Sequence, residues 1–449
     1  MSQSTVIRDV TLFTPQGRVQ GDCLIEDGEI AQLGEVTRAA DVELDGAGKW
    51  LFPGAFDAHV HVRDPGLTHK EDWRTGSMAA AAGGVTCMFD MPNTRPSTTT
   101  VARLEEKKAL VASKSLVNFG LFFGANPDNL DEILGAERFP ALKIFMAEST
   151  GDLLVHREED LDRIFANYTG QISAHAESEE RLLARIEEYK GNTDPAIHSV
   201  IRDPEAARLG VQMAAKLANR YGRRLHILHM STRAELEALE EGRAYAREHG
   251  TGAVITAEAC PHHLFLTTDA YEEWGTYVKM NPPLRGEEDR AAMWDALRDG
   301  RVQMVATDHA PHLPSEKDLG YPGAPSGVPG VQTMLPMLLD ASSRHGWCTP
   351  EQIVEWVCHA PARIYGVQGR GRLEVGCAAD VVLIDPELER EVTDAEQYSK
   401  CGWTPWRGRV LKGWPVRTFV NGALVFVRDG ERAEFATADP VGQLVSFDR

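Results

Sequence analysis

Short apolar segments alternate with longer amphipathic ones from Phe52 to about Tyr365, a pattern typical of repeated βα units. Amphipathic stretches rich in Ala, Leu, Glu and Arg at helical spacing predict helices, as at Ser178 to Tyr189, Glu205 to Tyr221 and Arg233 to His249. Eight apolar segments between such stretches read as buried strands: Phe56 to Val62, Val85 to Asp90, Val117 to Phe123, Ala141 to Met146, Gln171 to His175, Leu225 to Met230, Ala253 to Glu258 and Val302 to Thr307. Eight βα repeats predict a (β/α)8 TIM barrel.

The two ends of the chain show a different pattern, in which short β-like segments are separated by turn residues. Residues 4–51 contain the turn signals Asp27-Gly28 and Asp45-Gly46, and similar segments follow the predicted barrel. Asn421-Gly422 between apolar runs predicts a β-hairpin. We therefore expect an α/β protein with its barrel in residues 53–366, and a small composite β-sandwich formed by residues 1–52 and 367–449.

Composition narrows the classes of function. The chain has 449 residues, 43% of them apolar, so it can bury a large core. Its formal net charge of −20 argues against a surface that binds nucleic acid or an anionic membrane, because phosphate binding requires clustered Lys and Arg. A basic pocket for a small anion remains compatible with this charge.

The cysteines and the N-terminal residues indicate the compartment. The seven cysteines are scattered and form no Cys-x-x-Cys pair, which predicts reduced thiols and neither a disulfide framework nor a thiolate zinc site. The first residues lack a basic region followed by an apolar core, and no apolar run approaches the thickness of a bilayer. We expect a cytoplasmic protein without a membrane anchor.

The most specific motif is Asp57-Ala-His-Val-His-Val-Arg63, in which two histidines lie two positions apart on a predicted buried strand. Alternation along a strand directs His59 and His61 to the same face. Paired neutral imidazoles can bind a metal, and zinc is the first candidate because it favours nitrogen ligands. Taken alone, the pair would more often be two core histidines.

Further polar residues lie where predicted strands end, which is where the active site of such a barrel is found. The first strand ends with His59, His61 and Arg63, and the other strand-end candidates are Lys143, His175, His229 and Asp308. By contrast, His226 is three positions before His229, so it points to the opposite face and is expected to be structural.

Lys143 is unusual because Ala-Leu-Lys-Ile-Phe-Met places one ammonium group in an apolar strand. An unpaired buried charge costs several kcal/mol, so something must neutralise it. A salt bridge to a carboxylate is one solution, and it would be favoured without other ligands. Carboxylation by carbon dioxide is the other, because a buried lysine with a lowered pKa is the nucleophile for that reaction and the carbamate oxygens can bridge two metal ions.

Asp308 lies in Ala306-Thr-Asp-His-Ala-Pro-His312, where the last strand gives way to a loop. A carboxylate there can ligate a metal, accept a proton from water and return it to a leaving group. An N-cap or turn aspartate would be the default for this residue in isolation. We assign His309 at most an indirect role.

Candidate substrate-binding groups are found in the loops that follow the strands. The planar guanidinium group of Arg63 suits a carboxylate. Hydrogen bonds could be added by Asn93, His312 and, more weakly, Asn281. Asparagines are also common in turns. The cluster Cys260-Pro-His262-His263 has the composition of a site. It follows the predicted strand Ala253 to Glu258, which is already assigned to the barrel, so we interpret these residues as shaping the loop.

At this point the motifs resemble those of the dihydroorotases, in the cyclic amidohydrolase superfamily, from about Phe52 to Gly366. The specific segments are Asp57 to Asp72, Ala80 to Thr86, Asp90-Met-Pro-Asn-Thr94 and Ala306 to His312. Within the superfamily, Arg63 together with Asn93 points to dihydroorotase. The flanking β segments resemble the superfamily's composite sandwich.

The resemblance implies roles for the candidate residues. His59, His61 and Asp308 would hold one zinc ion, His175 and His229 a second, and carboxylated Lys143 would bridge them. Arg63, Asn93 and His312 would bind the substrate carboxylate, and Asp308 would move the proton to the ring nitrogen. The implied activity interconverts N-carbamoyl-L-aspartate and dihydroorotate in pyrimidine biosynthesis. We also expect a homo-oligomer, with aspartate transcarbamoylase as a candidate partner.

The sequence departs from the family pattern at three places. Val62 stands where many members have Phe. One branch of the family uses an aspartate in place of the lysine carbamate, and Asp152 lies near enough to Lys143 to keep that alternative open. The loop Ala324 to Gly330 resembles the family's substrate-binding segment only loosely.

Two other functions compete with this interpretation. A hydantoinase, dihydropyrimidinase or allantoinase shares the metal ligands but lacks the pair of Arg63 and Asn93. A catalytically inactive homologue could instead serve as a structural partner, for instance of aspartate transcarbamoylase. Such homologues lose ligands, whereas every expected ligand is present here.

Overall fold

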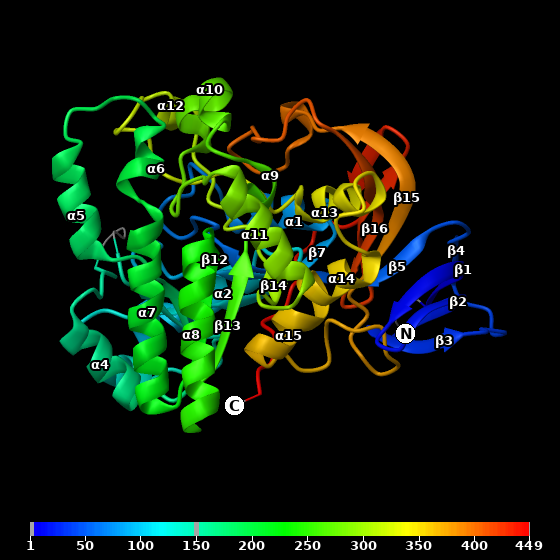
Figure 1. Cartoon of the computed structure of the whole chain (residues 1–449). Helices are drawn as coiled ribbons and strands as arrows, with labels where there is room; N and C mark the ends of the chain where they lie inside the picture. The colour runs from blue at the N-terminus through cyan, green and yellow to red at the C-terminus, as the bar shows by residue number, and fades with distance from the viewer. Residues whose placement is uncertain (1–3, 148–151, 449) are drawn as a thin grey trace.

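The centre of the molecule is a barrel of parallel strands surrounded by helices (Figure 1). The computed structural model describes residues 4–147 and 152–448. The barrel strands are β6 (Ala55–Val60), β7 (Val85–Asp90), β8 (Asn118–Leu121) continued by β9 (Phe123–Gly124), β10 (Leu142–Phe145), β11 (Ile172–His175), β12 (Arg224–Met230), β13 (Val254–Ala259) and β14 (Met304–Val305). Each coincides with a strand predicted from the sequence, and the (β/α)8 barrel is confirmed.

The barrel closes between its first and last strands. The His61 amide donates to the His309 carbonyl at 2.7 Å, and Val60 forms a parallel bridge with His309. The last strand is shorter than predicted, because its regular backbone hydrogen bonding to β13 ends at Ala306, whose amide donates to the Ala259 carbonyl at 3.1 Å. The Thr307 amide donates to the buried Asp57 carboxylate at 2.9 Å. Asp57 therefore joins the first strand to the segment that carries Asp308.

Helices follow most barrel strands and end at residues suited to helix termini. In α8, Thr232 and Glu235 form a capping box, and Gly250 ends the helix in the left-handed conformation. The helices are α1 (Trp73–Ala82), α2 (Val101–Ala112), α3 (Leu130–Gly135), α4 (Glu158–Asn167), α5 (Glu179–Glu188), α6 (Ile197–Ile201), α7 (Pro204–Tyr221), α8 (Arg233–His249), α9 (Pro261–Phe265), α10 (Ala270–Trp274), α11 (Glu287–Arg298), α12 (Pro314–Lys317), α13 (Met334–Ser343), α14 (Pro350–Val354) and α15 (Ala360–Tyr365).

Strands from both ends of the chain pair in one nine-stranded sheet beside the barrel (Figure 1). They are β1 (Thr5–Thr14), β2 (Gly17–Glu26), β3 (Glu29–Gly34), β4 (Val42–Asp45), β5 (Trp50–Pro53), β15 (Val381–Glu391), β16 (Val410–Val420), β17 (Ala423–Asp429) and β18 (Arg432–Phe435). Strand β5 lies between β1 and β15, so it joins the N-terminal strands to the C-terminal ones. Both groups contribute to one apolar cluster, and Asn421-Gly422 forms the predicted hairpin turn between β16 and β17.

The C-terminal residues leave this sheet and return to the barrel. The Phe119 amide donates to the Gln443 carbonyl at 2.9 Å, and the Val445 amide donates to the Phe119 carbonyl at 3.0 Å. Val445 packs in an apolar cluster with barrel residues such as Phe89 and Phe122. Part of the segment assigned to the sandwich by sequence thus lies against barrel strand β8.

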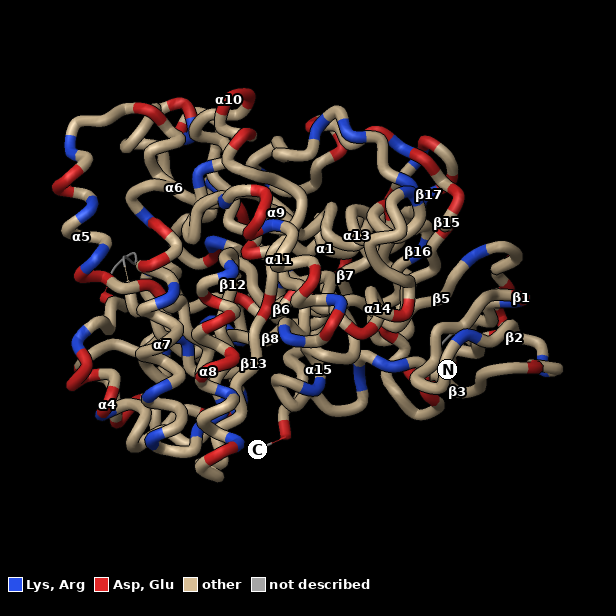
Figure 2. Tube along the Cα trace, in the orientation of Figure 1, with Lys and Arg blue, Asp and Glu red and all other residues tan. Residues whose placement is uncertain are grey.

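The exterior carries charges of both signs. Lys, Arg, Asp and Glu are interspersed along α4, α5, α7 and α8 (Figure 2). None of the described helices has the length and apolar character needed to cross a bilayer.

Candidate metal centre and substrate pocket

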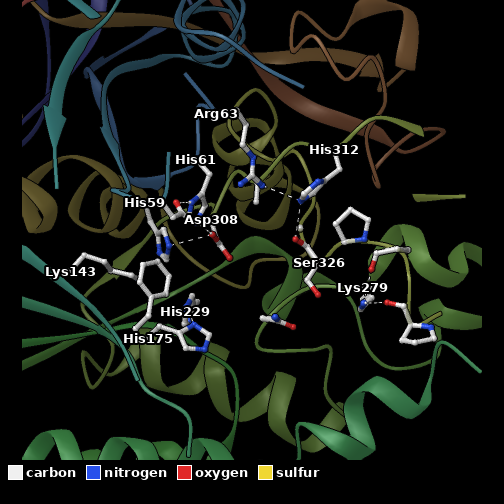
Figure 3. A pocket seen from close by; sticks show the side chains of 18 of the residues that line it. His59, His61, Arg63, Lys143, His175, His229, Lys279, Asp308, His312 and Ser326 are labelled. Carbon is white, nitrogen blue, oxygen red and sulfur yellow. Dashed lines mark hydrogen bonds and ion pairs between the residues drawn. The ribbon is translucent and has the colours of Figure 1, made fainter. Parts of the chain in front are cut away.

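A pocket of about 380 Å³ opens at the C-terminal ends of the barrel strands. Its lining includes all nine residues predicted to form the site: His59, His61, Arg63, Asn93, Lys143, His175, His229, Asp308 and His312, together with the weaker candidate Asn281. Figure 3 shows Asp308 between the histidines and lysine on one side and Arg63 with His312 on the other. The rule that strand ends gather at one face of the barrel therefore located these residues together.

His59, His61 and Asp308 form one compact group of potential metal ligands. The Nε2 atoms of His59 and His61 lie 3.3 and 2.9 Å from Asp308 Oδ1, and one ligand atom from each residue lies within 4.8 Å of the others. Burial alone would raise the pKa of Asp308, but the His59 and His61 imidazoles beside it hold that pKa well below its usual value. The carboxylate is therefore ionised, as a metal ligand must be.

The outer nitrogens of the two histidines are fixed by oxygen acceptors. His59 Nδ1 lies 2.5 Å from Glu258 Oε1, and His61 Nδ1 lies 2.7 Å from Asn93 Oδ1. A neutral imidazole that donates from Nδ1 keeps its lone pair on Nε2, which is the nitrogen that faces Asp308. This arrangement, in which the second nitrogen is bound to a carboxylate or carbonyl oxygen, orients metal-binding histidines.

Lys143 is fully buried, and no hydrogen-bond or ion-pair partner among the described residues reaches its Nζ atom. Its closest described interaction is with the Phe145 ring, whose centre lies 4.3 Å from Nζ. Burial lowers the pKa of Lys143 to about 7. A large fraction of this amine is therefore neutral near pH 7, which favours the carboxylation alternative over the salt bridge.

His175 and His229 direct nitrogens toward each other beside Lys143. His175 Nδ1 lies 2.9 Å from His229 Nε2, while His175 Nε2 lies 2.8 Å from Glu177 Oε2. The buried Glu177 is in turn paired with Arg202. Burial lowers the pKa of both histidines, so both rings are neutral and each can offer a lone pair. The convergence of these two nitrogens fits a second metal position.

Three residues of the site adopt the left-handed backbone conformation. The φ angles are +66° at Arg63, +38° at His229 and +49° at Asp308. For residues other than glycine this conformation costs about 1–3 kcal/mol each, and it persists where surrounding contacts hold it. Each of the three residues lies at the end of a barrel strand, where the bend turns its side chain into the pocket.

The opposite side of the pocket is basic. Arg63 is buried, with Nη2 3.1 Å from His312 Nε2 and Nε 3.3 Å from the Pro311 carbonyl. His312 also lies 3.0 Å from Lys70 Nζ through Nδ1 and 3.0 Å from the Ser326 carbonyl through Nε2. Burial and the neighbouring Arg63 lower the pKa of His312 well below its usual value. The neutral ring accepts from Lys70 through Nδ1, and its Nε2 lies beside the Arg63 guanidinium and the Ser326 carbonyl.

Two asparagines complete the polar wall, and each already uses its side-chain oxygen. Asn93 Oδ1 accepts from His61, and Asn281 Oδ1 accepts from His198 Nε2 at 2.8 Å. The amide nitrogen of each asparagine is the atom left to donate to a ligand. Asn93 is therefore held by the histidine group and keeps its amide nitrogen for a ligand in the pocket.

The loop of residues 322–327 forms a further wall of the pocket, and two buried lysines hold it. Lys279 Nζ donates to the carbonyls of Pro322 and Ala324 at 3.0 and 2.6 Å. Lys317 Nζ donates to three carbonyls, those of Lys279, Pro325 and Gly327. This wall includes most of the segment that resembled the family's substrate-binding loop only loosely.

The site also contains residues that were not predicted from the sequence: Glu258, Glu177, Arg202 and the two loop lysines. Glu258 ends a predicted strand, so the strand-end rule could have found it. The alternative bridging residue, Asp152, is exposed and is not among the described residues that line the pocket. His226, which was predicted to be structural, bonds through its two ring nitrogens to Thr256 and Glu258 and is not among the described residues that line the pocket.

Comparison with known proteins relates this geometry to an enzyme family. The model of the amidohydrolase family matches residues 50–425. A dihydroorotase from Methanosarcina mazei is 36% identical over 439 residues, which cover 95% of each chain. A dihydroorotase from Halobacterium salinarum is 37% identical and covers 92% of this chain and 97% of its own.

The similar solved structures are named hydantoinase or dihydropyrimidinase and not dihydroorotase. The L-hydantoinase (dihydropyrimidinase) from Arthrobacter aurescens superposes with a TM-score of 0.92 at 29% identity, covering 99% of this chain and 100% of its own. The dihydropyrimidinase from Brevibacillus agri gives a TM-score of 0.89 at 26% identity, with the same coverage. Sequence and structure therefore indicate the same class of enzyme but differ in the substrate named.

Proposed function

Because the chain belongs to the amidohydrolase family and is a cyclic amide hydrolase, we propose that it is a dihydroorotase. It would interconvert N-carbamoyl-L-aspartate and (S)-dihydroorotate in pyrimidine biosynthesis in the cytoplasm. The observation that carries this choice of substrate is the basic end of the pocket, where buried Arg63 lies beside His312. Hydantoin and dihydrouracil have no carboxylate for this end to bind.

The residues present fit a pair of zinc ions. His59, His61 and Asp308 would hold one ion and His175 and His229 the other, with a carbamate on Lys143 between them. Two observations support this assignment: Lys143 Nζ has no hydrogen-bond partner among the described residues, and the nitrogens of His175 and His229 face each other. The chemistry supplied by bound zinc is polarisation of the amide carbonyl and a lowered pKa of water.

The residues of the chain would orient the substrate and move one proton. Arg63, His312 and the amide groups of Asn93 and Asn281 would bind the carboxylate and the ring, which places the scissile amide beside Asp308. Because Asp308 Oδ1 faces both histidines, Oδ2 is the atom available to take a proton from the attacking water. Asp308 would then return that proton to the departing ring nitrogen.

Turnover of a substrate panel by the full-length protein tests this function. The zinc-reconstituted protein, with bicarbonate present, is assayed on dihydroorotate, N-carbamoyl-L-aspartate, hydantoin, dihydrouracil and allantoin. We expect activity confined to the first two compounds. Activity confined to the neutral rings would replace the proposed substrate with that of a hydantoinase, and no activity on any compound would indicate an inactive homologue.

Replacing Arg63 with Gln separates carboxylate recognition from the chemical step. We expect kcat/KM for dihydroorotate to fall by roughly 30- to 1000-fold, because a charged hydrogen-bond partner worth about 2–4 kcal/mol is lost. Any residual hydrolysis of a neutral ring should change little. The measurement is the ratio of the two kcat/KM values in wild type and variant.

Arg285 provides a matched control for this substitution. It is also a buried arginine, bonded to Ser231 and the Arg202 carbonyl, but it is not among the described residues that line the pocket. Arg285→Gln should lower stability without changing the substrate ratio. Equal losses on acidic and neutral substrates in Arg63→Gln would contradict the role given to Arg63.

A further inference from the structure

A second cluster of potential metal ligands lies at the turn between β13 and α9. Cys260, His262 and His263 are all buried, and one ligand atom from each lies within 4.8 Å of the others. None of these three side chains is among the described residues that line the substrate pocket. The cluster is therefore not part of the pocket lining, but it lies close enough to the site for the charge of Asp308 to act on Cys260 and His262.

The local backbone explains why these side chains meet. Cys260 is the N-cap of α9, and the His263 amide donates to the Cys260 carbonyl at 3.0 Å. N-cap and N3 side chains face each other at the start of a helix, as in a capping box. His262, one residue earlier than His263, places its ring 4.3 Å from the His263 ring, measured between centres.

One ring nitrogen of His263 has no hydrogen-bond partner in the part of the chain that the structure describes. Its Nε2 atom lies 3.1 Å from the Pro282 carbonyl, which can only accept a hydrogen bond, so Nε2 carries the proton. The Nδ1 lone pair is buried and has no hydrogen-bond partner among the described residues.

These features match those of a metal-binding histidine. Such residues donate one ring N–H to a carbonyl or carboxylate and present the other nitrogen to the ion. A thiolate and two imidazoles are the ligand types that Zn²⁺ prefers. The absence of a Cys-x-x-Cys pair had argued against a thiolate site, but that rule does not cover one cysteine combined with two histidines.

We propose that Cys260, His262 and His263 form an additional metal site for Zn²⁺ or a similar borderline-soft divalent ion. The ion would be bound by Cys260 Sγ and one nitrogen of each histidine, with a fourth tetrahedral position left for water. On binding, the Cys260 S–H bond breaks, an S–metal bond forms and the proton passes to solvent. The assignment of these three ligands does not rest on the dihydroorotase activity proposed above.

The proposed ion would stabilise one wall of the substrate pocket. His263 connects the site to the Pro282 carbonyl, and Pro282 follows the pocket residue Asn281 in the chain. An ion on the other nitrogen would fix the His263 ring and, through it, this loop. We therefore expect loading of the site to raise the thermal stability of the protein, because binding free energy adds to folding free energy.

Substitution with Co²⁺ gives a test that does not depend on activity. The full-length protein is stripped of metal and loaded with Co²⁺ in the presence of bicarbonate. The ligands proposed for the zinc pair are nitrogen and oxygen atoms, so a thiolate-to-cobalt charge-transfer band in the near ultraviolet would report Cys260. We expect this band in the wild type; its absence there would overturn the proposal.

Two variants and one control identify the residue that gives rise to the charge-transfer band. Cys260→Ser should lose it together with one equivalent of bound metal per chain. His263→Gln keeps the thiol, and it should raise the Co²⁺ concentration needed for half of the band by more than about tenfold. Cys358→Ser is the matched control, since Cys358 is equally buried but bonds to the Pro53 carbonyl. A band that persists in Cys260→Ser, or that is lost in Cys358→Ser, would contradict the assignment.

Discussion

Replacing Asp308 with Asn should lower kcat for dihydroorotate by roughly 10²- to 10⁴-fold, the range that a positioned acid–base group contributes. The amide is nearly isosteric, so the pocket keeps its shape. It cannot accept the proton of the attacking water, and it is a weaker partner for His59 and His61, whose Nε2 atoms face Asp308 Oδ1. The measurement is kcat together with the zinc content of each chain.

Asp340 offers a control for this substitution. Its exposed fraction of 8% equals that of Asp308, but Asp340 lies in helix α13 and contacts Arg344 and the Lys412 amide. Asp340→Asn should affect stability and leave kcat close to that of the wild type. If Asp308→Asn kept wild-type turnover with full zinc content, the proton-transfer role would have to move to another residue.

Replacing Lys143 with Ala should nearly abolish turnover and reduce the zinc bound per chain. The variant lacks the amine that carbon dioxide would modify, so the bridging carboxylate cannot form. A short aliphatic carboxylate such as butyrate should restore part of the activity, because it can enter the space left by the removed side chain. The measurement is turnover as a function of added carboxylate, with zinc and substrate fixed.

The alternative role of Lys143 as a salt-bridge partner makes a different prediction. A lysine that only neutralises a carboxylate would give wild-type protein whose zinc binding does not depend on bicarbonate, and butyrate would not rescue the variant. Lys107 is the matched control, since it is buried and paired with Asp90 at 2.6 Å. Lys107→Met should lower the free energy of unfolding, and an added carboxylate should not restore this stability.

Several features of the protein followed from local sequence patterns. Burial on both sides makes the strands of a parallel barrel continuously apolar, so the eight strands could be identified along the chain. Alternation on a strand directed His59 and His61 to one face, and the rule that strand ends gather at one face placed them with Arg63, His175 and Asp308. The hairpin at Asn421-Gly422 required only the local preference of these residues for positive φ.

Other features depend on contacts between segments that are distant in the chain. Glu258 bonds to His59 across 199 residues, and Lys317 holds a loop whose backbone carbonyls have no distinctive sequence. Whether Lys143 meets a carboxylate could not be read from its neighbours in the strand, because the answer depends on which residues the other seven strands bring to it. Local spacing determines the face on which a side chain lies, whereas packing of the whole barrel determines which atoms it meets.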